Sequence, residues 1–144
     1  MIGRLLEKMR LWHKKLIPVL PRQQLVGQWR ECCLIAKNIF ENGNPNHILV
    51  NRIMDYSIEH FFRYACDISG EMKKRGYKCD FSKFIKYIKD AQYVVEEDEL
   101  FYSWHDERYL RQCLYNLQEK FDCGGISLEE WKVIVDKFGE KLLW

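Results

Sequence analysis

The positions of proline constrain the fold of this chain more than any other sequence feature. Its three prolines are Pro18, Pro21 and Pro45, and the remaining two thirds of the 144 residues contain none. Because proline is the strongest helix breaker, helices can form without interruption over about a hundred residues. Apolar residues recur there at three- and four-residue spacing, which is typical of amphipathic helices, and no long strand-like alternation occurs. The sequence therefore predicts an all-α fold.

We expect a compact bundle of about six helices in a single domain over residues 1–144, since one core usually holds about 100–200 residues. Glycines of the kind that end helices follow three of the helical segments. Ser127 and Glu130 have the spacing of a capping box, and Ser57 is a predicted N-cap. The expected helices cover residues 22–41, 47–75 with a break near residue 56, 81–91 and 105–121, and a last one begins after Ser127.

Composition excludes several classes of protein. The chain is 47% hydrophobic and 15% aromatic, which is too apolar for a disordered protein. No apolar run approaches the roughly 18 residues that span a bilayer, so we expect no membrane contact. Six cysteines occur without CxxC or zinc-finger spacing, and no nucleotide- or metal-binding motif is present. We therefore expect a cytoplasmic protein with reduced thiols, no metal and no cofactor.

Charge is distributed unevenly although the formal net charge is only +2. Residues 1–40 contain eight Lys or Arg and two acidic residues, whereas residues 92–107 contain six acidic residues and no Lys or Arg. A basic N-terminal region is what a polyanionic partner such as DNA requires. A charge run is also found on any solvated helix, so this feature alone does not decide between the two interpretations.

One polar cluster lies in the segment RQQLVGQWRE at residues 22–31. Helical spacing places Glu31 near Gln24, Gly27 and Gln28. A carboxylate beside two amides and a bare glycine could form the wall of a polar pocket. The alternative is an exposed amphipathic face with a local ion pair, and spacing alone favours that alternative.

Two sequence blocks, MRLWH at residues 9–13 and LPRQQLVGQWRE at residues 20–31, resemble the start of the pyrimidine-dimer DNA glycosylase family of the phage endonuclease V type. Weaker similarity continues through residues 46–51, 72–77 and 105–120. The resemblance implies a DNA repair glycosylase with an associated abasic-site lyase activity on ultraviolet pyrimidine dimers. We expect it to act on double-stranded DNA, and to do so as a monomer.

In that family the N-terminal α-amine attacks the sugar of the damaged nucleotide and forms a Schiff base, and β-elimination then cuts the strand. Carried over by the resemblance, the glutamate that serves this chemistry is Glu31, and Arg30 beside it binds phosphate. Arg22, Gln23 and Gln24 would line the DNA side of the same helix. An α-amine suits the reaction because its reference pKa is near 8, against about 10.4 for lysine. A fixed carboxylate stabilises the positive charge that develops on the sugar.

The identity of the nucleophile is left open by the sequence. Residues 1–8 precede the family's usual start, so we expect them to be an extension. While they are attached, the nitrogen of Arg10 is an amide and cannot attack. The nucleophile is then the α-amine of Arg10 once it is exposed, the α-amine of Met9, or absent. Lys14 or Lys15 is a fallback with a less suitable pKa.

Further DNA contacts are predicted at a helix start and on a late helix. His47 is a candidate contact to a phosphate or to a flipped base, against a capping or packing role. Arg108, Arg111 and Lys120 are candidates for a second contact to the DNA backbone from one helix face, against a solvated face. The rival interpretation of the chain is a non-catalytic helical DNA-binding or interaction protein that keeps the fold. A helical scaffold with no DNA role is a third.

Overall fold

The computed structural model describes residues 9–43 and 47–142, and this part of the chain contains helices and turns but no strand. The predicted all-α class with about six helices is confirmed. All six cysteines are free thiols. The α-helices are α2 (Arg22–Asn42), α3 (Ile48–Met54), α4 (Ile58–Lys74), α5 (Ser82–Ile85), α6 (Glu107–Asp122) and α7 (Leu128–Phe138), and the 3-10 helices are η1 (Lys14–Val19) and η2 (Gly139–Leu142).

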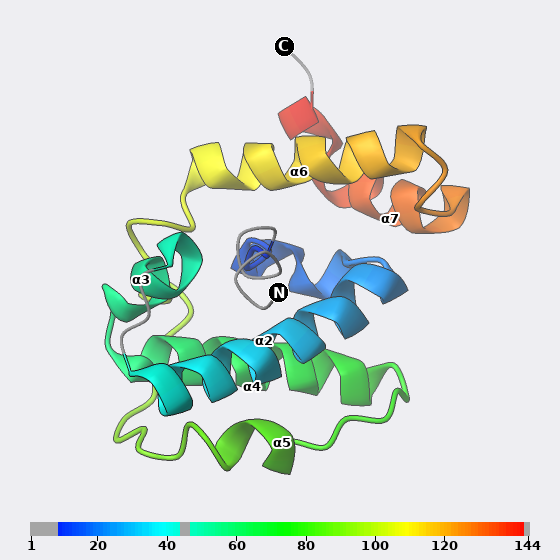
Figure 1. Cartoon of the computed structure of the whole chain (residues 1–144). Helices are drawn as coiled ribbons and strands as arrows, with labels where there is room; N and C mark the ends of the chain where they lie inside the picture. The colour runs from blue at the N-terminus through cyan, green and yellow to red at the C-terminus, as the bar shows by residue number, and fades with distance from the viewer. Residues whose placement is uncertain (1–8, 44–46, 143–144) are drawn as a thin grey trace.

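The helices form two groups with the N-terminal segment between them (Figure 1). Helices α2 and α4 pack against each other, with α5 against α2 and α3 against α4. Helices α6 and α7 form the second group, and η1 contacts both α4 and α7. Within the described ranges, no helix is long and apolar enough to cross a membrane.

The segment before α2 is part of the core and is held by three different helices. The Trp12 N–H donates to Gln28 Oε1 of α2 at 2.7 Å. The Tyr64 hydroxyl of α4 donates to the Trp12 carbonyl at 2.6 Å, and the Tyr109 hydroxyl of α6 donates to the Leu11 carbonyl at 2.7 Å. Because buried backbone groups need such partners, these bonds fix the path of the chain around residue 10.

Several helix ends follow the predicted local chemistry. Gly43, Gly76 and Gly124 adopt positive φ angles of 66°, 81° and 83°, a conformation that side-chain-bearing residues rarely adopt. Before α7, the Ser127 side chain accepts from the Glu130 N–H and the Glu130 side chain accepts from the Ser127 N–H, so the capping box is confirmed. These ends were predictable because each depends on a few neighbouring residues.

The predicted break between α3 and α4 is confirmed, and Ser57 is the N-cap residue of α4 as predicted. Its side chain, however, makes no capping hydrogen bond. Its hydroxyl pairs instead with the hydroxyl of Tyr93, which lies in the irregular acidic stretch. A tertiary contact therefore takes the place of the local one.

The predicted helix over residues 81–91 is wrong, because α5 covers only Ser82–Ile85. The N–H of Ile88 still donates to the Phe84 carbonyl at 3.1 Å, and the helical pattern ends there. Further along, the Glu59 carboxylate of α4 accepts from the Gln92 N–H at 2.7 Å. This long-range bond holds the chain on a path that a continued helix would not follow.

Candidate active site

The polar cluster on α2 lines a cavity, although spacing alone favoured an exposed amphipathic face. Helical spacing brings Gln24, Gly27 and Glu31 to the same side of α2, as predicted. The cavity has a volume of about 190 Å³. Its lining is completed by the N-terminal segment and the end of α6: the full set is Arg10, Trp12, Gln23, Gln24, Gly27, Glu31 and Lys120.

The electrostatics of this cavity centre on the Glu31 carboxyl group. Burial raises the pKa of Glu31 from 4.5 to about 7, against the guanidinium charge of Arg10, a hydrogen bond from the Arg10 backbone N–H and the charge of Lys120. Near neutral pH both protonation states are therefore populated, which suits a group that must accept and return a proton.

Gln28 is a positioning residue that the sequence placed near Glu31 without assigning it a role. It is buried, and its Oε1 accepts from the Trp12 N–H and, at 3.0 Å, from the Tyr64 hydroxyl. Its Nε2 donates to the Arg10 carbonyl at 2.9 Å and to the Glu31 carboxylate at 3.3 Å. One amide therefore orients both the backbone at residue 10 and the carboxylate opposite it.

The predicted DNA-facing residues of α2 divide into two sets. Gln23 and Gln24 line the Glu31 cavity, and Gln24 Oε1 is buried with no hydrogen-bond partner among the described residues. Such an acceptor requires a donor from a ligand or solvent. Arg30 is exposed and does not line the cavity. Arg22 is exposed at the start of α2, with its guanidinium 5.1 Å from the ring centre of Tyr77.

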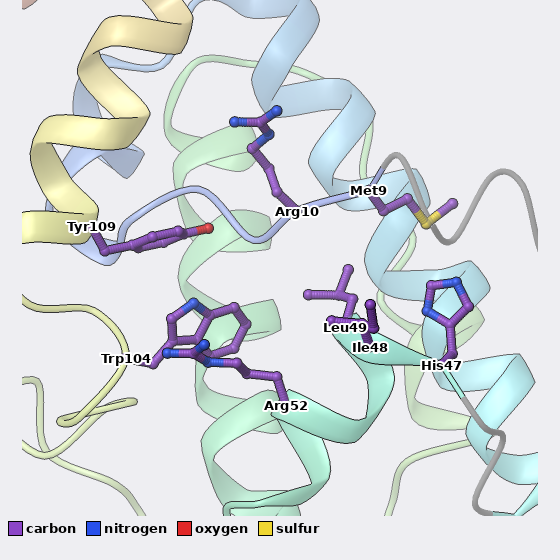
Figure 2. A pocket seen from close by; sticks show the side chains of 8 residues that line it. All are labelled: Met9, Arg10, His47, Ile48, Leu49, Arg52, Trp104 and Tyr109. Carbon is purple, nitrogen blue, oxygen red and sulfur yellow. The ribbon is translucent and has the colours of Figure 1, made fainter.

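A second cavity of about 310 Å³ shares Arg10 with the first (Figure 2). Met9 and His47, both named from the sequence, lie here. Arg52, Trp104 and Tyr109 were missed, because they come from segments far apart in the chain and carry no common motif. The complete lining is Met9, Arg10, His47, Ile48, Leu49, Arg52, Trp104 and Tyr109.

The prediction that Arg108, Arg111 and Lys120 share one face of a helix is wrong. Lys120 lines the Glu31 cavity, whereas Arg108 and Arg111 line a shallow depression elsewhere on α6. The reason is geometric, since at 3.6 residues per turn the nine residues from Arg111 to Lys120 make two and a half turns. Lys120 therefore belongs to the Glu31 site.

The lysine fallback for the nucleophile does not fit the structure. Lys14 is buried, and its ammonium group donates to the carbonyls of Glu97 at 2.5 Å and Leu100 at 2.7 Å. Lys15 is exposed and lines neither cavity. In the described ranges, no three His, Cys, Asp or Glu side chains are arranged to hold a metal ion.

A known protein family matches the part of the chain that contains Arg10, Gln28 and Glu31. Residues 9–84 match the family model for pyrimidine dimer DNA glycosylase, which is more than half of the chain. The chain belongs to the pyrimidine dimer DNA glycosylase family. The family match includes Arg10, Gln28 and Glu31, and it ends before α6. Residues 1–8, the predicted extension, precede the match and lie outside the described residues.

No curated protein and no solved structure matches the chain. Assignment to the pyrimidine dimer DNA glycosylase family therefore depends on residues 9–84, and the roles of individual residues depend on the geometry of the two cavities.

Proposed function

We propose that this protein breaks the glycosidic bond of one pyrimidine in ultraviolet pyrimidine dimers of duplex DNA and that the Glu31 cavity is its active site. Membership of the pyrimidine dimer DNA glycosylase family supports the glycosylase activity. The observation that carries the site is the position of the Glu31 carboxylate beside the backbone nitrogen of Arg10, in a cavity that also contains Lys120.

The proposed reaction uses an α-amine at this position and no cofactor. The amine nitrogen forms a bond to C1′ of the damaged nucleotide, and the glycosidic bond breaks with its electron pair leaving on the base. Ring opening gives a Schiff base, and loss of a C2′ proton then expels the 3′ phosphate. Glu31 stabilises the positive charge on the sugar and carries the protons that the amine and C2′ release. Its pKa of about 7 suits both roles.

This proposal requires that the active form of the protein begins at Arg10 or Met9. Two observations support it: the family match begins at Met9, and the nitrogen that would become the amine of Arg10 is the one beside Glu31. With residues 1–8 attached, that nitrogen is an amide with no free electron pair for attack, and we expect no covalent chemistry.

DNA binding is proposed to depend on cations around the two cavities. Within the described ranges, Arg10 and Lys120 form no ion pair, so both charges are available to phosphates. Gln23 and Gln24 offer amides beside them. Arg22, Arg30 and His47 are proposed as peripheral contacts, and Arg108 and Arg111 as a separate contact to the DNA backbone. Because these contacts to phosphates release counterions from the DNA, the affinity of the proposed monomer for DNA should fall steeply as the salt concentration rises.

The Glu31→Gln variant tests the proposal when it and the wild type both begin at Met9 or Arg10. It removes the charge with little change in shape, so glycosidic and strand cleavage should be lost while binding to irradiated duplex is retained. Glu41→Gln, an exposed position at the end of the same helix, is the matched control and should behave as wild type. Normal cleavage by Glu31→Gln would show that the site is wrong. Binding without glycosidic cleavage by wild-type forms that begin at Met9 and at Arg10 would favour the non-catalytic alternative.

A further inference from the structure

Ile48 stands out among the large apolar side chains because 86% of it is exposed. It is the first residue of α3 and lies at the edge of the second cavity. The next residue, Leu49, is only 8% exposed and provides the packing of this turn of the helix. Single exposed apolar residues are common on protein surfaces, so the inference depends on what surrounds Ile48.

Two cations line the same cavity as this apolar tip. Arg10 comes from the N-terminal segment and Arg52 from α3, and in Figure 2 Arg10 lies above and Arg52 below Ile48 and Leu49. Their guanidinium groups rest over the rings of Trp12 and Trp104, at 5.0 and 5.2 Å from the ring centres. Within the described ranges neither arginine forms an ion pair.

An apolar tip with two cations in the same cavity is complementary to duplex DNA, in which apolar stacked bases lie beside charged backbones. A guanidinium that stacks on an aromatic ring keeps its N–H edge available for phosphate. Isoleucine suits insertion because its β-branched side chain is stiff at χ1. Apolar side chains that enter a base step unstack the bases and bend the duplex.

We propose that Ile48 is a wedge that enters the base stack beside the damaged nucleotide, while Arg10 and Arg52 hold nearby phosphates. This inference rests on the proposed function and makes Ile48 a positioning residue for it. Arg10 lines both cavities, so insertion at Ile48 would occur next to the Glu31 site. The wedge would supply the local unstacking that brings the sugar within reach of the nucleophile.

The test compares Ile48→Ala with wild type, both beginning at Met9 or Arg10, on one pyrimidine dimer placed either in a paired duplex or opposite unpaired bases. The control is Val94→Ala, which shortens another apolar side chain that is 78% exposed, in the irregular stretch after α5. We expect Ile48→Ala to break the glycosidic bond about tenfold more slowly in the paired duplex and at the wild-type rate in the unpaired substrate. Ile48→Leu should keep most of the wild-type rate on the paired duplex.

A second readout separates unstacking from catalysis. A 2-aminopurine placed beside the dimer should become brighter when wild type binds, and should stay dim with Ile48→Ala. Equal rates for Ile48→Ala and wild type, or equal losses on both substrates, would overturn the wedge. If wild type brightens the probe but breaks no glycosidic bond, the proposed function fails while the wedge is supported. If wild type neither brightens the probe nor breaks a glycosidic bond, both are overturned.

Discussion

The environment of the Glu31 carboxyl group disfavours its ionised form. Its side chain is half-buried beside Gln28 and Arg10, and burial raises its pKa to about 7 although two cations are nearby. An acid whose pKa is higher in the folded protein than in the unfolded chain destabilises the fold once it ionises. The raised pKa that lets Glu31 carry a proton near neutral pH therefore lowers the free energy of unfolding once Glu31 ionises.

This cost predicts that Glu31→Gln stabilises the protein at alkaline pH. The folded protein holds the Glu31 proton up to about pH 7 and the unfolded chain releases it near 4.5, so the stability of wild type falls as the pH rises through that window. Allowing for partial exposure, the variant should exceed wild type by about 1–2 kcal/mol in free energy of unfolding at pH 8. Near pH 4 the two should agree. Urea denaturation at both pH values measures this, and an equal difference at both would refute the assigned pKa.

On the scale of a single element, α2 contains a glycine that its packing does not require. A Cβ built on Gly27 meets nothing within 4 Å, and Gly27 lies in the wall of the Glu31 cavity. Glycine within a helix costs about 0.5–1 kcal/mol relative to alanine. We interpret the bare position as room for a ligand to approach the helix backbone.

Gly27→Ala should therefore stabilise the protein and weaken its function. We expect the free energy of unfolding to rise by about 0.5–1 kcal/mol while affinity for irradiated duplex falls. Gly70→Ala is the matched control, since Gly70 lies within α4 and a Cβ there also meets nothing within 4 Å. It should give the same stabilisation and unchanged affinity. Unchanged affinity with Gly27→Ala would mean that DNA does not approach this wall.

At the scale of the whole molecule, the N-terminal segment brings polar groups into the centre of the fold. His13 and His105 are 1% and 5% exposed, and their rings stack with centres 5.1 Å apart. His105 Nδ1 accepts from the Lys14 N–H at 2.9 Å. Burial lowers the pKa of His13 to about 4 and that of His105 to about 2. Both rings are therefore neutral where the protein is stable.

The two histidines predict a loss of stability in mild acid. The unfolded chain takes up protons near pH 6.5 and the folded protein does not until about pH 4 or below, so stability declines as the pH falls through that range. Because Glu31 acts in the opposite direction, we expect a net loss of about 2 kcal/mol between pH 7 and 4.5 in wild type. The loss should be larger in Glu31→Gln. A flat profile in that variant would show that the histidines are not neutral and buried.

Local features of the molecule were predictable from the sequence, and the contacts between distant segments were not. Periodicity indicated α2, α4, α6 and α7, and the capping box at Ser127 depends on four consecutive residues. The helix predicted over 81–91 covers only Ser82–Ile85, and just beyond that range Glu59 of another element accepts from the Gln92 N–H, a contact that no local pattern indicates. In the site, spacing placed Glu31 beside Gln24 and Gly27. No pattern indicated that Lys120 would reach the same cavity or that Arg52 and Trp104 would form a second one beside it.

The central claim, a covalent reaction of the α-amine beside Glu31, is tested most directly by borohydride trapping on irradiated duplex DNA. Three forms of the protein should be compared, beginning at Met1, at Met9 and at Arg10, with the attached residue identified by mass spectrometry. We predict an adduct on the terminal nitrogen of a form that begins at Met9 or Arg10, and none on the form that begins at Met1. An adduct on a lysine side chain, or active cleavage with no adduct, would contradict the account.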